Sequence, residues 1–86
     1  MKDCDSAKCF SNDQLVCMKE FYKLGFRFIA RDKFSTLNVY KHMPDRKSFY
    51  WKTEDACCSV TLPIELFPQV LWKDEYPICF SDYIDI

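Results

Sequence analysis

The stretch FRFIARDKFSTLNVYKHMPDRKSFYW, residues 26–51, contains the strongest strand pattern in the chain. Side chains alternate between two faces along Phe26–Arg31 and again along Thr36–Lys41, as they do in β-strands. The four residues between these runs fit a hairpin turn. A second turn at Met43–Lys47 precedes an aromatic run, Ser48–Thr53, which suits a third strand. The stretch therefore predicts a meander of antiparallel strands.

The first turn of this meander contains no glycine. Residues other than glycine meet a steric penalty in the left-handed backbone region. If the turn needs a left-handed residue, that residue is expected to be Lys33 or Ser35. The same turn places Phe34, a large apolar side chain, at the tip of the hairpin.

A helix is predicted over Asn12–Leu24. Ser11 and Gln14 have the spacing of a capping box, in which each side chain binds the backbone N–H of the other residue. Gly25 stands where a helix commonly ends. Apolar residues recur along one side at helical spacing, namely Leu15, Met18, Phe21 and Tyr22. We expect this amphipathic helix to cover one face of the meander.

Shorter elements flank the helix and the meander. Cys57–Leu62 suits a fourth strand, and Pro63–Phe67 suits one turn of helix with proline in its first turn. Residues 1–10 form a loose lead-in. The tail at residues 78–86 alternates apolar and acidic residues, and it either frames the edge of the sheet or stays mobile.

The predicted fold class is α+β. One N-terminal helix packs on a three- to four-stranded antiparallel meander, with a short helical turn and an extended acidic tail at the C-terminus. The chain of 86 residues forms one small domain, residues 1–86. The predicted core consists of Leu15, Met18, Tyr22, Phe26, Phe28, Leu37, Val39, Phe49, Trp51, Val60, Leu62, Leu66, Phe67 and Trp72.

The composition excludes several classes of protein. A chain that is 49% hydrophobic and 17% aromatic is not a disordered one. No apolar run approaches the roughly 20 residues that span a bilayer. The polar, acidic N-terminus lacks the apolar core of a signal peptide. We therefore expect a soluble cytoplasmic protein, a monomer or homodimer, with no membrane association.

The six cysteines are expected to be unpaired. A reducing compartment keeps thiols free, and the adjacent Cys57 and Cys58 are poorly placed for disulfides. We expect Cys17, Cys79 and one of this adjacent pair to be small buried apolar residues. No C-x-x-C pair is present to anchor zinc. A metal site would need an unusual meeting of Cys4, Cys9, His42, Cys57, Cys58 and Cys79, so we expect no metal.

Nothing in the sequence suggests catalysis. His42 is the only histidine, and Gly25 is the only glycine, so there is no glycine-rich loop to hold a phosphate. A cysteine or histidine nucleophile needs an orienting partner that the sequence does not indicate. We expect no enzymatic activity and no cofactor.

Charge is distributed unevenly, although the net charge is −1. Residues 19–52 hold nine Lys/Arg and three Asp/Glu, whereas residues 53–86 hold one Lys and seven Asp/Glu. These halves neutralise each other within the fold, or one of them binds a charged partner. A nucleic acid is one such partner, because cations hold phosphates and aromatic rings stack on bases. The residues concerned are Arg27, Arg31, Lys33, Lys41, Arg46, Lys47 and Lys52, with Tyr40, Tyr50 and Trp51.

An ordered set of residues between Phe26 and Pro77 resembles a group of small accessory proteins from phages and prophages of Gram-positive bacteria. The set is Ala30-Arg31-Asp32-Lys33, Leu37, Tyr40-Lys41, Pro44, Arg46 and Trp51, then Leu66-Phe67-Pro68, Trp72, Asp74-Glu75 and Pro77. Three positions depart from the pattern. Phe34-Ser35 replaces an Asp-Gly-like pair, Asn38 replaces an aromatic residue, and Met43 replaces a lysine.

This resemblance brings no catalytic residues. It implies a non-enzymatic protein that binds and modulates a bacterial host or defence protein in the cytoplasm of the infected cell. An inhibitor of the anti-restriction or anti-CRISPR type is one such protein. A nucleic-acid-binding accessory protein that uses the basic, aromatic meander is the alternative.

Aromatic and arginine side chains are common anchors of protein interfaces. The candidate partner-binding residues are Phe34, Arg31, Lys33, Arg46, Lys47, Asp74, Glu75 and Tyr76. An acidic set could also imitate the charge of a nucleic-acid backbone, and it consists of Asp74, Glu75, Asp82 and Asp85.

Overall fold

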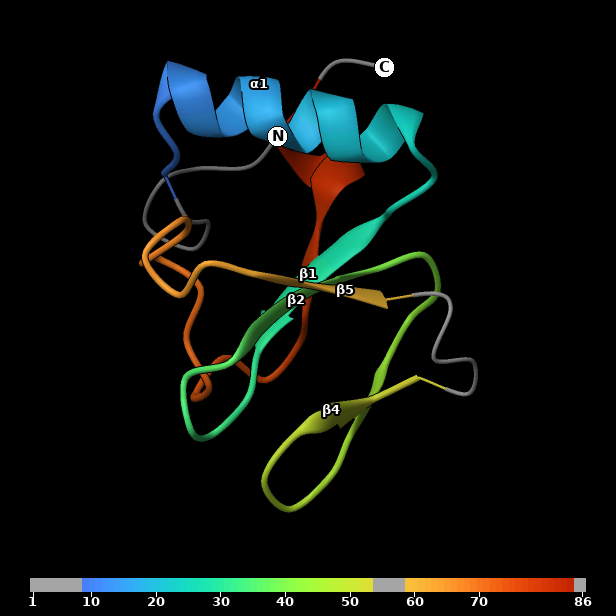
Figure 1. The fold of residues 1–86 in the computed structure, drawn as a ribbon, viewed down its shortest axis with the longest axis vertical. Helices are drawn as coiled ribbons and strands as arrows, with labels where there is room; N and C mark the ends of the chain where they lie inside the picture. Colours follow the sequence, from blue (N-terminus) through green and yellow to red (C-terminus); the bar gives the residue numbers. More distant parts are fainter. Residues whose placement is uncertain (1–8, 54–58, 85–86) are drawn as a thin grey trace.

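The computed structural model describes residues 9–53 and 59–84. Helix α1 (Asn12–Lys23) lies above a set of short strands (Figure 1). The strands are β1 (Phe28–Arg31), β2 (Leu37–Tyr40), β3 (Asp45–Arg46), β4 (Trp51–Lys52), β5 (Ser59–Leu62) and β6 (Ile78–Cys79). A 3₁₀ helix, η2 (Phe80–Asp82), follows the last strand.

Helix α1 begins and ends where its sequence signals predict, within one residue. The capping box is present: Gln14 N donates to Ser11 Oγ at 3.2 Å, and Ser11 N donates to Gln14 Oε1 at 2.8 Å. Gly25 follows the helix with φ of 103°, a conformation that favours glycine. No helix among the described residues is long and apolar enough to cross a membrane.

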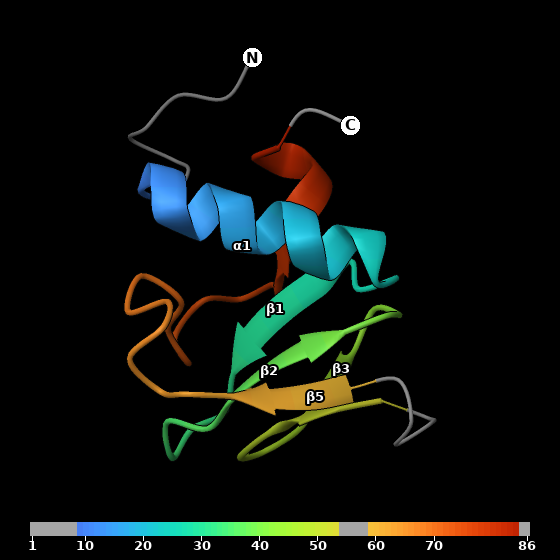
Figure 2. The same cartoon turned by 45° about the horizontal axis from the view of Figure 1, so that its top comes forward.

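The main sheet has four antiparallel strands in the order β5-β2-β1-β6. β1 and β2 form the predicted hairpin, with Ile29 opposite Val39. Figure 2 shows α1 lying across one side of this sheet. One helix on a four-stranded antiparallel sheet confirms the predicted α+β class.

The order of the strands differs from a simple meander. β4 pairs with β3 in a separate two-stranded sheet, and β5 takes the place beside β2. The third strand, predicted over Ser48–Thr53, is reduced to Trp51–Lys52 because residues 47–50 form the turn. In this turn Lys47 N donates to Tyr50 O at 2.8 Å. The turn predicted at Met43–Lys47 therefore lies a few residues too early in the chain.

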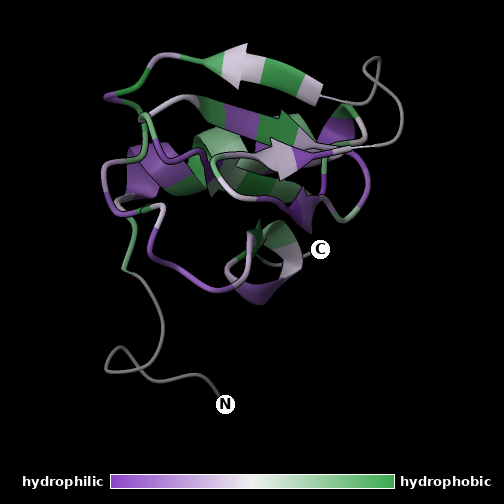
Figure 3. Cartoon of the chain, turned by 90° about the horizontal axis from the view of Figure 1, so that it is seen from below, coloured by the Kyte–Doolittle hydropathy of each residue, from purple (hydrophilic) through white to green (hydrophobic). Residues whose placement is uncertain are grey.

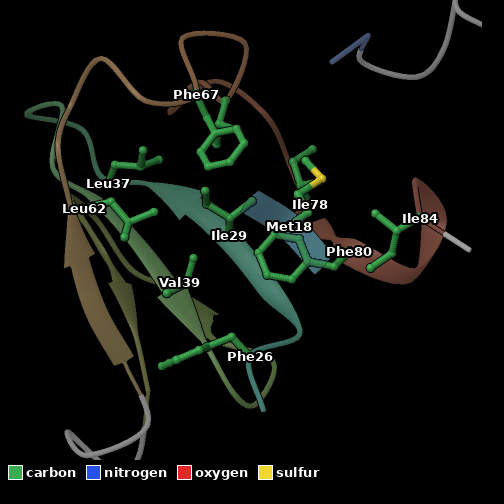
Figure 4. Packing of buried hydrophobic residues seen from close by; sticks show 11 residues of the cluster. Met18, Phe26, Ile29, Leu37, Val39, Leu62, Phe67, Ile78, Phe80 and Ile84 are labelled. Atoms are coloured by element: carbon green, nitrogen blue, oxygen red, sulfur yellow. The ribbon is translucent and has the colours of Figure 1, made fainter. Parts of the chain in front are cut away.

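The larger hydrophobic cluster fills the space between the sheet and α1. Met18 of the helix, Ile29 of β1 and Val39 of β2 are fully buried in it. Phe67 and Phe80 come to the same cluster from the C-terminal third (Figure 4). These residues attach the C-terminal segments to the helix side of the sheet.

A smaller cluster covers the other face of the sheet. Ala30, Tyr40 and Trp51 are buried there, with Phe28 and Trp72 packed against them. Neighbouring residues of one strand therefore enter different clusters, as strand geometry requires. Figure 3 shows hydrophobic (green) and more hydrophilic (white or purple) positions following one another along some of the strands.

Two predicted core residues are wrong, and seven buried hydrophobic residues were not predicted: Ile29, Ala30, Tyr40, Val70, Ile78, Phe80 and Ile84. Phe49 is 50% exposed because it lies in the β3–β4 turn, and Val60 is 47% exposed on the edge strand β5. Ile29 is fully buried, although only its neighbours Phe26 and Phe28 were assigned to the core. The prediction buried one face of β1, whereas both faces are covered.

The C-terminal segment frames the edge of the sheet, one of the two alternatives that its sequence left open. β6 pairs with β1, and Phe80 and Ile84 are buried. At residues 63–67 the chain makes one turn, in which Leu66 N donates to Pro63 O at 3.2 Å; the 3₁₀ helix comes later, at η2. Most of the lead-in, the start of the predicted fourth strand and the last two residues lie outside the described residues.

Candidate partner-binding surface

Two turns lie at the end of the molecule away from α1 (Figure 1). The first turn connects β1 to β2, and the second connects β3 to β4. They are joined through the backbone, because Lys33 N in the first turn donates to Phe49 O in the second at 2.9 Å. The two turns therefore form one surface.

Trp51 fixes the second turn against the main sheet. Its backbone N–H donates to Asp32 Oδ1 at 2.8 Å, and its indole Nε1 donates to Arg31 O at 3.1 Å. The Trp51 side chain is buried in the smaller cluster. These contacts hold the turns in a defined arrangement before any partner binds.

The first turn directs Phe34 into solvent. Ser35 N donates to Asp32 O at 3.0 Å, and Asp32 N donates to Thr36 O at 2.8 Å. Ser35 has φ of 79°, so it is the left-handed residue, one of the two positions predicted. Phe34 is 74% exposed at the tip of this turn.

The exposed rings of the two turns lie beside each other. The ring centroids of Phe34 and Phe49 are 6.0 Å apart, and the Lys33 Nζ lies 4.9 Å from the Phe49 centroid. Tyr50, next to Phe49, is 46% exposed. We call Lys33, Phe34, Lys47, Phe49 and Tyr50 the paired-turn surface.

Part of this surface is hollowed. An open hollow of about 770 Å³ is lined by Arg46, Lys47, Ser48, Phe49 and Tyr50. Its lining therefore combines two cations, one hydroxyl and two aromatic side chains. Such a lining suits contact with a partner that is both apolar and negatively charged.

Arg31 is not part of the surface, contrary to its prediction as a partner-binding residue. Its side chain is buried and donates to three backbone carbonyls. The donor–acceptor distances are 2.6 Å to Val70 O, 2.8 Å to Ser35 O and 2.9 Å to Phe67 O. Arg31 therefore holds the C-terminal segment and the first turn against β1.

The remaining candidates lie around Trp72. The guanidinium of Arg46 stacks 3.8 Å from the Trp72 centroid and donates to Asp74 O. Asp74 Oδ2 accepts from Leu71 N at 2.9 Å, so this carboxylate stabilises its own loop. Glu75 is exposed, and Tyr76 is 71% exposed. The structure therefore joins this acidic loop to β3 through Arg46.

Part of the predicted row of cations and stacking rings is used inside the fold, whereas Lys33, Arg46, Lys47 and Lys52 are exposed. Tyr40 and Trp51 are buried, so their ring faces are not available to bases. The Arg27 guanidinium lies 3.8 Å from the Tyr22 centroid and donates to the carbonyls of Tyr22 and Phe26. Of the three aromatic residues in the nucleic-acid hypothesis, Tyr50 is exposed.

Two groups among the described residues, Asp32 and Tyr40, have clearly shifted pKa values. Burial raises the pKa of the Asp32 carboxyl, and the hydrogen bond from Trp51 opposes this rise. Burial, followed by the charge of Asp32, raises the pKa of Tyr40 to about 12. Both shifts follow from packing between the sheet and the β3–β4 hairpin.

Cysteine and other metal-binding side chains are scattered in the described part of the chain. Cys17 and Cys79 are half-buried thiols, and Cys79 Sγ lies 3.2 Å from Ser81 Oγ. Cys57 and Cys58 lie outside the described residues. Residues 9–53 and 59–84 contain no group of three His, Cys, Asp or Glu side chains placed to hold a metal.

Sequence reasoning missed Phe49 as a surface residue because it assigned Phe49 to the core, and it named Tyr50 only as a stacking residue of the nucleic-acid alternative. It placed them in a strand because aromatic residues favour strands. The polar residues Lys47 and Ser48, directly before them, were the available signal for a turn. Lys33, Phe34 and Lys47 were predicted as partner-binding residues, and the structure brings them together with Phe49 and Tyr50.

Comparisons with protein-family models, curated proteins and solved structures give no match to this chain. The function is therefore argued from the paired-turn surface.

Proposed function

We propose that this protein is a non-enzymatic interaction protein that binds a partner protein through the paired-turn surface. The sequence resemblance to phage accessory proteins suggests a bacterial host or defence protein as the partner, with binding in the cytoplasm of the infected cell. In this proposal the chain modulates its partner by occupying a surface, as an anti-restriction or anti-CRISPR inhibitor does.

One observation carries the proposal: two phenylalanine rings from different turns are exposed side by side on a scaffold that fixes both turns. Phe34 and Phe49 are 74% and 50% exposed. Fully burying a phenylalanine side chain contributes roughly 1.5–3 kcal/mol. Exposed aromatic side chains whose burial releases this much free energy are typical anchors of interfaces.

The fixed geometry of the turns adds to this argument. The Lys33–Phe49 backbone hydrogen bond and the two hydrogen bonds from Trp51 already order the turns. Binding of a partner at this surface therefore costs little free energy for ordering the two turns. Arg46, which lines the hollow, also donates to Asp74 O and so connects this surface to the loop that carries Glu75 and Tyr76.

A nucleic acid is the alternative partner, since Lys33, Lys47 and Tyr50 are exposed together. Against it, Tyr40 and Trp51 are buried and Arg31 is bound to carbonyls. The favoured partner is therefore a protein.

The test uses the full chain, tagged, to capture proteins from a bacterial host lysate with and without nuclease. The matched baits are wild type, the double variant F34A/F49A, and the control V16A/L24A. Val16 and Leu24 are 58% and 67% exposed on and after α1, so the control removes comparable apolar surface elsewhere. Circular dichroism checks that each bait is folded.

We expect wild type and V16A/L24A to retain one stoichiometric host protein after nuclease treatment, and F34A/F49A to lose it. Equal capture by F34A/F49A contradicts the proposed surface. Capture that disappears with nuclease supports the nucleic-acid alternative, which a salt titration of binding would then measure. Absence of any captured protein contradicts both.

A further inference from the structure

We infer that the partner inserts an acidic segment at the paired-turn surface, with carboxylates meeting the cations of the hollow and an apolar side chain packing on the two phenylalanine rings. This inference rests on the proposed function and adds the chemistry of the partner.

The hollow offers positive charge without a matching carboxylate in its lining. Arg46 and Lys47 line it, and Lys33 stands over Phe49 beside it. Neither lysine forms an ion pair within residues 9–53 and 59–84. A partner carboxylate would therefore meet two lysines, Lys33 and Lys47, that are not already paired with a carboxylate among the described residues.

Three aspartates lie near these cations. Asp74 accepts from Arg46 through its backbone carbonyl, and its Oδ2 accepts from Leu71 N at 2.9 Å. Asp45 precedes Arg46 in β3. In the strand register Asp45 lies opposite Lys52, and Arg46 lies opposite Trp51. Neighbouring strand residues point to opposite faces, so Asp45 lies on the face opposite Arg46. Asp32 accepts from the backbone of Trp51, beneath the turns. None of these three carboxylates lines the hollow.

Apolar and charged contacts are available together at this site. The Phe34 and Phe49 rings are tilted by 30° with centroids 6.0 Å apart, which gives a continuous apolar platform. The Lys33 Nζ lies over the Phe49 ring, 4.9 Å from its centroid, and Lys47 lines the hollow together with Phe49. Complementary charges at an edge steer association and fix the orientation of the partner, while the rings supply most of the affinity.

A phosphate backbone fits the same site less well. A base sandwiched between two rings needs them about 7 Å apart, twice the contact distance between stacked rings, and these centroids are 6.0 Å apart. Affinity for a nucleic acid grows with the number of phosphates that cations neutralise. The site offers three cations, Lys33, Arg46 and Lys47, on a chain of net charge −1.

The test is a selection from a random displayed peptide library against the immobilised full chain, with the variant K33Q/K47Q as a subtractive bait. A selected peptide is then synthesised together with a copy in which Asn and Gln replace Asp and Glu. Fluorescence anisotropy compares their binding with that of a labelled oligothymidylate. The variant K19Q/K23Q, which removes two lysines from α1, is the control for net charge.

We expect enriched peptides to combine Asp or Glu with an aromatic or aliphatic residue. The amide copy, and the K33Q/K47Q variant, should each weaken binding about tenfold or more, whereas K19Q/K23Q should not. Enrichment of neutral or basic peptides, or no enrichment at all, overturns the inference. Tighter binding of oligothymidylate than of the acidic peptide also overturns it.

The experiment separates this inference from the proposed function. If selected peptides need Phe34 and Phe49 but not their own carboxylates, the surface is correct and the acidic chemistry is wrong. If F34A/F49A leaves capture of the host protein unchanged, the proposed function itself is wrong.

Discussion

The backbone N–H of Trp51 donates a hydrogen bond to Oδ1 of Asp32, 2.8 Å away. Trp51 belongs to the separate β3–β4 hairpin, whereas Asp32 directly follows β1 of the main sheet. This bond therefore connects the two sheets beneath the paired-turn surface. Binding of a partner there depends on the bond because it holds the two turns in place.

Removing the Asp32 acceptor should loosen the hairpin. In D32A the partly buried N–H of Trp51 loses its partner, which should lower the free energy of unfolding by about 1–3 kcal/mol. In D32N the amide oxygen can still accept, so a smaller change is expected. Urea unfolding of both variants measures the difference, and equal stability of D32A and D32N would contradict this role for the bond.

The raised pKa of Asp32 predicts a dependence of stability on pH. The folded state binds this proton more tightly than the unfolded state, so the stabilisation is fully present below the ordinary pKa of 3.8. It is lost as the pH rises through the folded-state pKa. The free energy of unfolding of wild type should therefore fall relative to D32N over this acidic range. A difference that rises with pH would contradict the direction of the shift.

The raised pKa of Tyr40 predicts a loss of stability at alkaline pH. Its pKa is raised from 10.0 to about 12, so the folded state holds the phenol proton more tightly. The resulting stabilisation is fully present below pH 10 and is lost as the pH rises through about 12. Unfolding of wild type and Y40F should show a constant difference below pH 10 that declines above it. Lysines titrate in both wild type and Y40F, so their contribution cancels in the difference between the two free energies of unfolding. A difference that stays constant above pH 10 as well would contradict the prediction.

Arg31 should contribute to the stability of the fold, so its replacement should lower the free energy of unfolding. In R31M three backbone carbonyls lose a charged donor within the fold. The expected loss in free energy of unfolding is about 3 kcal/mol or more, because each hydrogen bond to a charged group contributes about 1.5–3 kcal/mol. The control K33M changes an exposed residue and should alter stability little. Thermal unfolding followed by circular dichroism makes the comparison, and similar melting temperatures would show that Arg31 is dispensable.

Replacement of Ser35 by glycine should stabilise the fold. The Ser35 φ of 79° lies in the left-handed region, where a side chain costs about 1 kcal/mol. S35G should therefore raise the free energy of unfolding by up to about 1 kcal/mol, reduced by the greater freedom of glycine in the unfolded chain. S35A keeps the Cβ and should not gain. A destabilised S35G in denaturant unfolding would contradict the expected gain from relief of backbone strain.

Some features of the chain follow from short-range rules. The capping box of Ser11 and Gln14 and the glycine at position 25 set the ends of α1, because the groups involved lie within one turn of helix. Alternation along residues 28–31 and 37–40 set the first hairpin, because strand side chains repeat every second residue. The α+β class follows from these two elements together.

Contacts between distant parts of the chain required the tertiary structure. β5 rather than β4 pairs with β2, and β4 packs instead on the far face, so Phe49 and Tyr50 became surface residues. Arg31 and Phe34 were both expected at the surface, yet only Phe34 is exposed there, because carbonyls from Phe67 and Val70 reach the Arg31 guanidinium. Local pattern specifies which residues form an element, whereas burial depends on which other elements cover it, and that information lies far away in the sequence.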